Sequence, residues 1–123
     1  MSQIRFSESH EWVYVDGDVA IVGITDHAQN LLGDIVFVDL PEVGKKFTRE
    51  GGFAVIESVK AATDVYMPVS GTVTGVNSDL ADEPELINQE PMGAGWLVKI
   101  TLDNPAELDT LLDQAGYDKM IAE

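Results

Sequence analysis

The chain has 123 residues, and its 7 lysines and arginines against 22 aspartates and glutamates give a formal net charge of −15. It contains no cysteine, so the polypeptide itself offers no disulfide, thiolate zinc site, iron–sulfur cluster or cysteine nucleophile. So acidic a composition argues against nucleic acid and anionic membrane as partners, because both attract lysine and arginine.

Short strands separated by turn residues dominate residues 10–102. The first prediction is a hairpin, in which 10–15 and 19–22 flank the turn dipeptide Asp16-Gly17. A short helix is expected near 26–32, with Asp26 as its cap, Gln29 completing a capping box and Gly33 ending it. Further strands are predicted at 35–40, 53–59, 65–67, 71–76 and 96–102. Strands at this spacing indicate antiparallel sheets packed as a sandwich or small barrel.

A helical segment is expected at about 104–122, packed on the sheets. Asn104 has the chemistry of a cap, Pro105 suits the first helical position, and Glu107 follows three residues after the cap. Gly116 is expected to interrupt the segment before one more turn. The inward side chains should be Leu108, Leu111, Leu112, Tyr117, Met120 and Ile121. With a hydrophobic content of 45%, we expect a single domain over residues 1–123.

The sequence offers few candidate catalytic residues. His10 and His27 lack a partner at metal-ligand spacing, so no metal site is predicted. No serine lies in a nucleophile-elbow pattern. The segment Met1–Arg5 lacks the features of a secretion signal, and no apolar run approaches the roughly 20 residues that cross a bilayer. We expect a cytoplasmic protein with no membrane partner.

One lysine stands out because the β-type run 53–59 ends directly before it. Lys60 is followed by Ala61 and then by a second run from Val65, which places it at or beside a hairpin tip. Glu57 and Asp64 flank it and favour its ammonium form, so Schiff-base chemistry is not expected. Two readings remain from the residues alone: a solvated turn lysine, or a lysine presented for acylation by a separate enzyme.

The segment Glu57-Ser58-Val59-Lys60-Ala61, followed by Asp64, resembles the lipoylation motif of the H proteins of the glycine cleavage system. The resemblance extends from about Phe6 to the C-terminal helix. The other matching blocks are Ser9-His10-Glu11-Trp12, Gly23-Ile24-Thr25-Asp26-His27-Ala28-Gln29, Leu32-Gly33-Asp34-Ile35-Val36 and Gly95-Trp96-Leu97-Val98-Lys99-Ile100. It implies a mainly β, lipoyl-type flattened barrel sandwich of two antiparallel sheets. Ala54 departs from the family, in which glycine is common at that position.

The resemblance also implies a function. Lys60 is expected to carry lipoate as an amide, and the protein to be a monomeric carrier rather than an enzyme, in a bacterial cytoplasm. Its expected partners are glycine decarboxylase (P-protein), aminomethyltransferase (T-protein) and dihydrolipoamide dehydrogenase (L-protein). A lipoate ligase or an octanoyl/lipoyl transferase is expected to attach the cofactor.

Two groups of site residues follow from the resemblance. The lipoylating enzyme is expected to recognise Glu57, Val59, Ala61 and Asp64, although Val59 or Ala61 could equally pack the hairpin. The matching positions for a cleft that holds the loaded arm are Ser9, Glu11 and Asp64, with Glu11 as the main counter-charge to the amine. An ordinary exposed strand acid is the alternative for Glu11.

Three other classes of protein are the alternatives. Biotin carriers have methionines on both sides of the lysine, whereas Val59 and Ala61 stand here. Lipoyl domains of 2-oxo-acid dehydrogenases usually belong to longer chains with a linker. The third alternative is an unmodified acidic interaction module that merely retains the fold.

Overall fold

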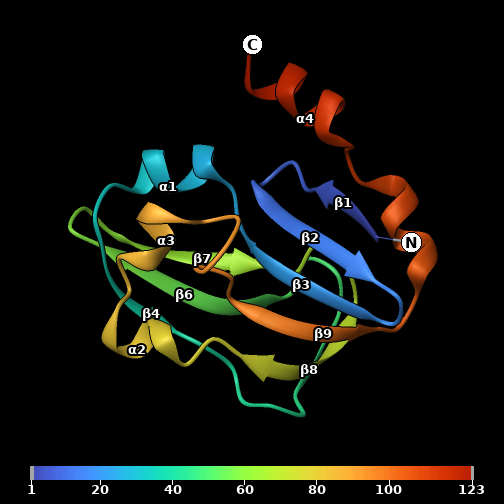
Figure 1. The fold of residues 1–123 in the computed structure, drawn as a ribbon, viewed down its shortest axis with the longest axis horizontal. Coiled ribbons are helices and arrows are strands. Elements are labelled where there is room, and N and C mark those ends of the chain that lie inside the picture. Colours follow the sequence, from blue (N-terminus) through green and yellow to red (C-terminus); the bar gives the residue numbers. More distant parts are fainter. Residues whose placement is uncertain (1, 123) are drawn as a thin grey trace.

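The computed structural model describes residues 2–122 as two antiparallel sheets with short helices at their edges (Figure 1). In chain order the elements are β1 (Ser2–Phe6), β2 (Glu11–Asp16), β3 (Val19–Ile24), α1 (Asp26–Leu32), β4 (Ile35–Asp39), β5 (Lys46–Phe47), β6 (Gly52–Ser58), β7 (Ala62–Tyr66), β8 (Gly71–Val76), α2 (Asp79–Asp82), α3 (Leu86–Gln89), β9 (Val98–Leu102), the 3-10 helix η1 (Pro105–Thr110) and α4 (Gln114–Ile121). The larger sheet has the strand order β1-β2-β3-β9-β8-β5, and the smaller has the order β4-β6-β7.

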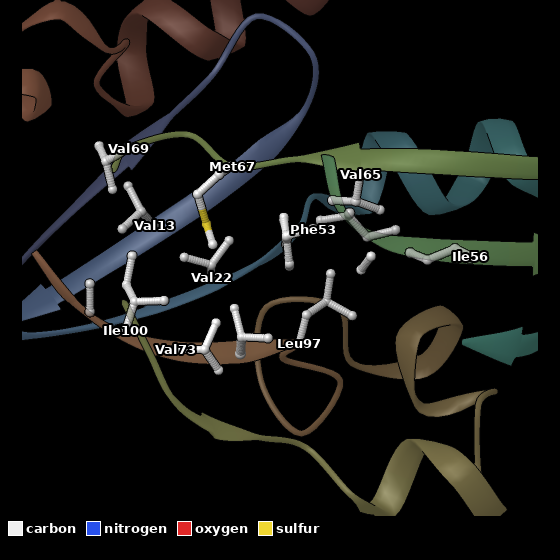
Figure 2. Packing of buried hydrophobic residues seen from close by; sticks show 14 of the residues in the cluster. Val13, Val22, Phe53, Ile56, Val65, Met67, Val69, Val73, Leu97 and Ile100 are labelled. Carbon is white, nitrogen blue, oxygen red and sulfur yellow. The ribbon is translucent and has the colours of Figure 1, made fainter. Parts of the chain in front are cut away.

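The core lies between the two sheets, whose inward side chains interdigitate (Figure 2). Alternation along each strand selects these residues, as in β2, where Val13 and Val15 are buried and Tyr14 is exposed. A second cluster of Phe6, Trp12 and Tyr117 joins β1, β2 and α4. The fold therefore fixes α4 to the outer edge of the larger sheet.

The predicted sandwich of two antiparallel sheets is confirmed, but the sheets do not close into a barrel within residues 2–122. The hairpin 10–15/19–22 is present as β2 and β3, and β8 has the predicted bounds. The strand predicted at 65–67 begins three residues earlier, at Ala62, which shortens the turn around Lys60. Four elements were missed because each is short or lies at a terminus: β1, β5, α2 and α3.

The cap predicted for α1 is wrong by one residue. The Thr25 hydroxyl accepts the Ala28 amide at 3.2 Å, while Asp26 is the first helical residue. Gln29 does pair with Asp26, but through a side-chain bond of 2.8 Å. Gly33 ends the helix as predicted, with a φ of 80° that glycine adopts without steric cost.

The C-terminal segment is two helices with an extended link, not one helix interrupted at Gly116. Asn104 caps η1 as predicted. After η1 the backbone becomes extended, and Leu112 pairs with Phe6 through bonds of 2.8 and 2.9 Å. Asp113 then caps α4 by accepting the Gly116 amide at 2.8 Å, so Gly116 lies inside the helix. Tyr117 is buried, as predicted.

Candidate functional site

Lys60 lies exposed at the tip of the β6–β7 hairpin, which projects beside α1 (Figure 1). The Ser58 amide donates to the Ala61 carbonyl at 2.9 Å and closes the turn. The Ser58 hydroxyl also accepts the amides of Lys60 and Ala61 at 3.2 and 3.3 Å. This network holds the backbone that presents the lysine in one conformation.

The tip is also anchored to the loop between α1 and β4. The Val59 amide donates to the Asp34 carbonyl at 3.0 Å. The Lys60 side chain runs past Gly33, where an added Cβ would stand 3.3 Å from the lysine Cε. Within residues 2–122 the one ion pair joins Lys46 and Asp103, so Lys60 takes part in none. Hydrogen bonds therefore hold the backbone around Lys60, while its ammonium group forms no ion pair with the described carboxylates.

The four predicted recognition residues surround this lysine. Glu57, Val59, Ala61 and Asp64 are all exposed, and 66% of the Val59 surface is accessible. A valine side chain that is this exposed does not pack against the hairpin. All four are therefore accessible to another protein.

The predicted cleft residues Ser9 and Glu11 meet in a cavity of about 390 Å³ at the other end of β7. Glu11 is 4% exposed, and one of its carboxylate oxygens, Oε1, accepts the hydroxyls of Ser7 and Ser9 at 2.6 and 2.5 Å. Burial raises the pKa of Glu11, and the bonds from Ser7, Ser9 and the Tyr66 backbone offset part of that rise. Glu11 is not an ordinary exposed strand acid.

Asp64 does not line this cavity. It lies on the outward face of β7 and lines a neighbouring open groove of about 720 Å³, to which Tyr66 also contributes. Tyr66 belongs to both the groove and the cavity. The outward residues Ala62, Asp64 and Tyr66 therefore lead along an edge strand from the lysine tip toward Glu11.

The polar cavity residues that sequence reasoning missed include Ser7, Arg49, Glu50 and Tyr66. Ser7 shares a two-residue spacing with Ser9 and Glu11, which is a weak signal. Arg49 and Glu50 come from the turn before β6, so only the fold brings them to Glu11.

His10 and His27 lie beside side chains that connect α4 to the start of α1. The His10 Nδ1 lies 2.8 Å from the Tyr117 hydroxyl, which lies 2.6 Å from the Thr25 hydroxyl. The two imidazole rings are 4.7 Å apart. Burial lowers the pKa of His10, and His27 lowers it further. These contacts fasten α4 to the start of α1.

A rigid hairpin that presents one lysine, on a fold of two antiparallel sheets, defines a carrier domain of the lysine-modified type. The family model for the glycine cleavage H-protein matches residues 4–123. The glycine cleavage system H protein of Parvibaculum lavamentivorans is 55% identical over 121 residues, covering 98% of this chain and 97% of its own. This chain belongs to the glycine cleavage H-protein family, the lipoyl carriers of the glycine cleavage system.

Further relatives agree over nearly the whole chain. The glycine cleavage system H protein 2 of Pseudomonas putida is 55% identical over 123 residues, covering 99% of this chain and 96% of its own. The crystal structure of a glycine cleavage system H protein from Mycobacterium marinum is 33% identical, has a TM-score of 0.89 and covers 98% of both chains. Among the described residues, none of the helices has the length and apolar character needed to traverse a bilayer.

Proposed function

We propose that Lys60 carries lipoate through an amide and that the protein acts as a shuttle substrate without catalysing a reaction itself. The observation that carries this proposal is the exposed lysine at a hydrogen-bonded hairpin tip, which belongs to no ion pair among residues 2–122. In this role the aminomethyl group of glycine passes from glycine decarboxylase (P-protein) to aminomethyltransferase (T-protein). Dihydrolipoamide dehydrogenase (L-protein) then reoxidises the arm.

The residues around Lys60 suit such a group. Gly33 leaves the flank of the lysine open, and the described contacts of β7 leave one edge of that strand unpaired. Six residues separate Lys60 from Tyr66, a span of about 20 Å at ~3.3 Å per residue. When bound, lipoate supplies a dithiolane, one sulfur of which accepts the aminomethyl group. The residues of the chain itself present, guide and shelter the lipoyl group.

Intact mass of protein purified from a lipoate-replete host tests the attachment. The wild type is expected to carry one lipoyl increment, Lys60→Arg to lack it, and Lys45→Arg, at another exposed lysine, to keep it. An unmodified wild type, or an increment that survives in Lys60→Arg, would overturn the proposal.

Glu11 is proposed as the counter-charge of the loaded arm. Its carboxylate is buried, and Ser7 and Ser9 orient it within the cavity. A protonated amine that enters this low-dielectric site gains strongly from a fixed carboxylate. The loaded carrier loses its cargo when water displaces the thiol, giving formaldehyde, ammonium and the free thiol. Glu11→Gln is expected to lose the aminomethyl group at least severalfold faster than wild type; equal rates would refute this role.

The exposed set Glu57, Val59, Ala61 and Asp64 is proposed to guide a lipoate ligase or an octanoyl/lipoyl transferase. Glu57→Gln and Val59→Ala are expected to slow lipoylation of Lys60 while leaving the unfolding midpoint unchanged, since both side chains are solvated. Lipoylation at the wild-type rate in both variants would count against the set.

Residues 1–123 are proposed to act as one monomeric lipoyl-carrier domain in a bacterial cytoplasm. The nearly full-length family match and the bacterial sources of the relatives support this. Sedimentation equilibrium is expected to give the monomer mass of 13.3 kDa, and a stable dimer would contradict it.

A further inference from the structure

We propose that Glu50 is a further carboxylate of the loaded-arm cleft and holds the cationic cargo together with Glu11. This inference rests on the proposed function of Lys60.

The first support is placement. Glu50 lines the 390 Å³ cavity together with Glu11, and it also lines a smaller adjoining cavity of about 260 Å³ with Ser9 and Tyr66. Ser9 links the two, because its hydroxyl donates to Glu11. Asp64 lines neither cavity. A ligand that reaches Glu11 past Ser9 and Tyr66 therefore meets Glu50.

The second support is the backbone of Glu50. Its φ is 69°, in the left-handed region that side chains other than glycine and asparagine rarely adopt. The surrounding turn enforces this conformation: the Glu50 amide donates to the Met67 carbonyl at 2.7 Å, and the Gly51 amide donates to the Thr48 carbonyl at 2.9 Å. Glycine would suit the position better on conformational grounds alone. A glutamate held at this cost is consistent with a role for its carboxylate.

The third support is charge. Glu8, Glu11 and Glu50 line the larger cavity against a single base, Arg49. None of these four side chains belongs to the one ion pair described within residues 2–122. The lining therefore has an excess of negative charge that a primary ammonium partly neutralises. Glu50 is exposed, so it can close over cargo that the buried Glu11 already contacts.

The test starts from lipoylated protein loaded with the aminomethyl group by glycine decarboxylase and glycine, then separated from the enzyme. Glu50→Gln and Glu50→Gly are compared with wild type for the rate at which formaldehyde is released. Both variants are expected to release it about threefold faster or more. Glu42→Gln, which removes the same charge outside both cavities, is expected to stay within twofold of wild type.

Two further measurements separate cargo binding from structure. Glu50→Gly is expected to keep or raise the unfolding midpoint, because glycine relieves the left-handed strain, and yet to release cargo faster. The Glu50 amide resonance is expected to shift on loading of the wild type and not on lipoylation alone. Wild-type release rates in both Glu50 variants, or an unmoved resonance, would overturn the inference. Failure of the proposed function is distinct, since wild type would then take up neither lipoate nor cargo.

Discussion

Glu11 combines a structural cost with a functional use. Burial raises its pKa, which means that the fold favours the protonated carboxyl over the carboxylate. The hydroxyls of Ser7 and Ser9 restrain that rise by donating to one oxygen. A cationic cargo beside the carboxylate would pull the pKa down again, so the site is most stable when it holds the amine.

Glu11→Gln is therefore expected to stabilise the unloaded protein at neutral pH. Because the folded-state pKa is raised, Glu11 costs no stability below the ordinary glutamate pKa of about 4.3. The cost grows as pH rises above that value and is complete once pH exceeds the folded-state pKa. Urea denaturation at pH 7 is expected to show a gain on the order of 1 kcal/mol in the free energy of unfolding, vanishing near pH 4. Exposed Glu8→Gln is the matched control and should show no gain at either pH.

At the scale of elements, the end of α1 shapes the surroundings of the Lys60 side chain. Gly33 ends the helix with a φ of 80° and a ψ of −157°, a combination available to glycine alone. The next residue, Asp34, accepts the amide of Val59 at the hairpin tip. The end of this short helix therefore has two effects. It fixes the hairpin tip, and it leaves room beside the Lys60 side chain.

Gly33→Ala is expected to lower the free energy of unfolding by about 1–3 kcal/mol and to slow lipoylation. The backbone strain accounts for the first effect and the new Cβ, 3.3 Å from the Lys60 Cε, for the second. Gly44→Ala is the control, because its φ of 96° brings similar strain while no atom lies within 4 Å of its added Cβ. Denaturation curves and a mass-spectrometric time course measure both effects. Equal lipoylation rates in the two variants would show that the Gly33 position does not control access.

The C-terminal segment shows what sequence can and cannot predict about such elements. The Asn104 cap of η1 and the inward Tyr117 could be predicted because cap chemistry and helical spacing are local. The break at Leu112 was not, because it depends on β1, a strand distant in sequence whose Phe6 exchanges two backbone bonds with Leu112. A leucine stripe therefore looked helical while its backbone is partly extended.

The cleft residues likewise include some that were predicted and some that were missed. Ser9 and Glu11 were assigned to the cleft through the resemblance, and the structure brings them together in one cavity. Arg49 and Glu50 were missed, because only the fold brings the turn before β6 and the β1–β2 loop to the lining of one cavity. Asp64 was assigned to the cleft through resemblance, whereas strand alternation turns it toward the adjacent groove.

For the molecule as a whole, the absence of cysteine and the charge of −15 suit a carrier that visits several enzymes. The dithiol arm proposed for Lys60 would meet no thiol on its own carrier, so it could not be trapped as an intramolecular mixed disulfide. The acidic surface steers encounter with basic protein faces, and this steering acts on the association rate. Acylation of Lys60 removes one further positive charge from the region that the partners must approach.

Added salt is therefore expected to raise the apparent KM of glycine decarboxylase for the lipoylated protein without changing kcat, because screening slows encounter and not chemistry. Two double variants separate local docking from total charge, since each raises the net charge by two. One removes Asp34, whose carbonyl accepts the Val59 amide at the hairpin tip, and Asp39, which lines the groove with Asp64. The other removes Asp16 and Asp18 at the β2–β3 turn, which lies at the far end of the molecule (Figure 1).

Screening confines strong interactions to about 8 Å at physiological ionic strength, so charges near the arm should dominate the contact. The Asp34→Asn/Asp39→Asn variant is expected to raise KM severalfold at low salt and to flatten its dependence on salt, while Asp16→Asn/Asp18→Asn stays near wild type. Equal effects of the two variants would mean that partners respond to net charge alone. A KM that does not change with ionic strength in the wild type would show that the acidity serves no role in docking.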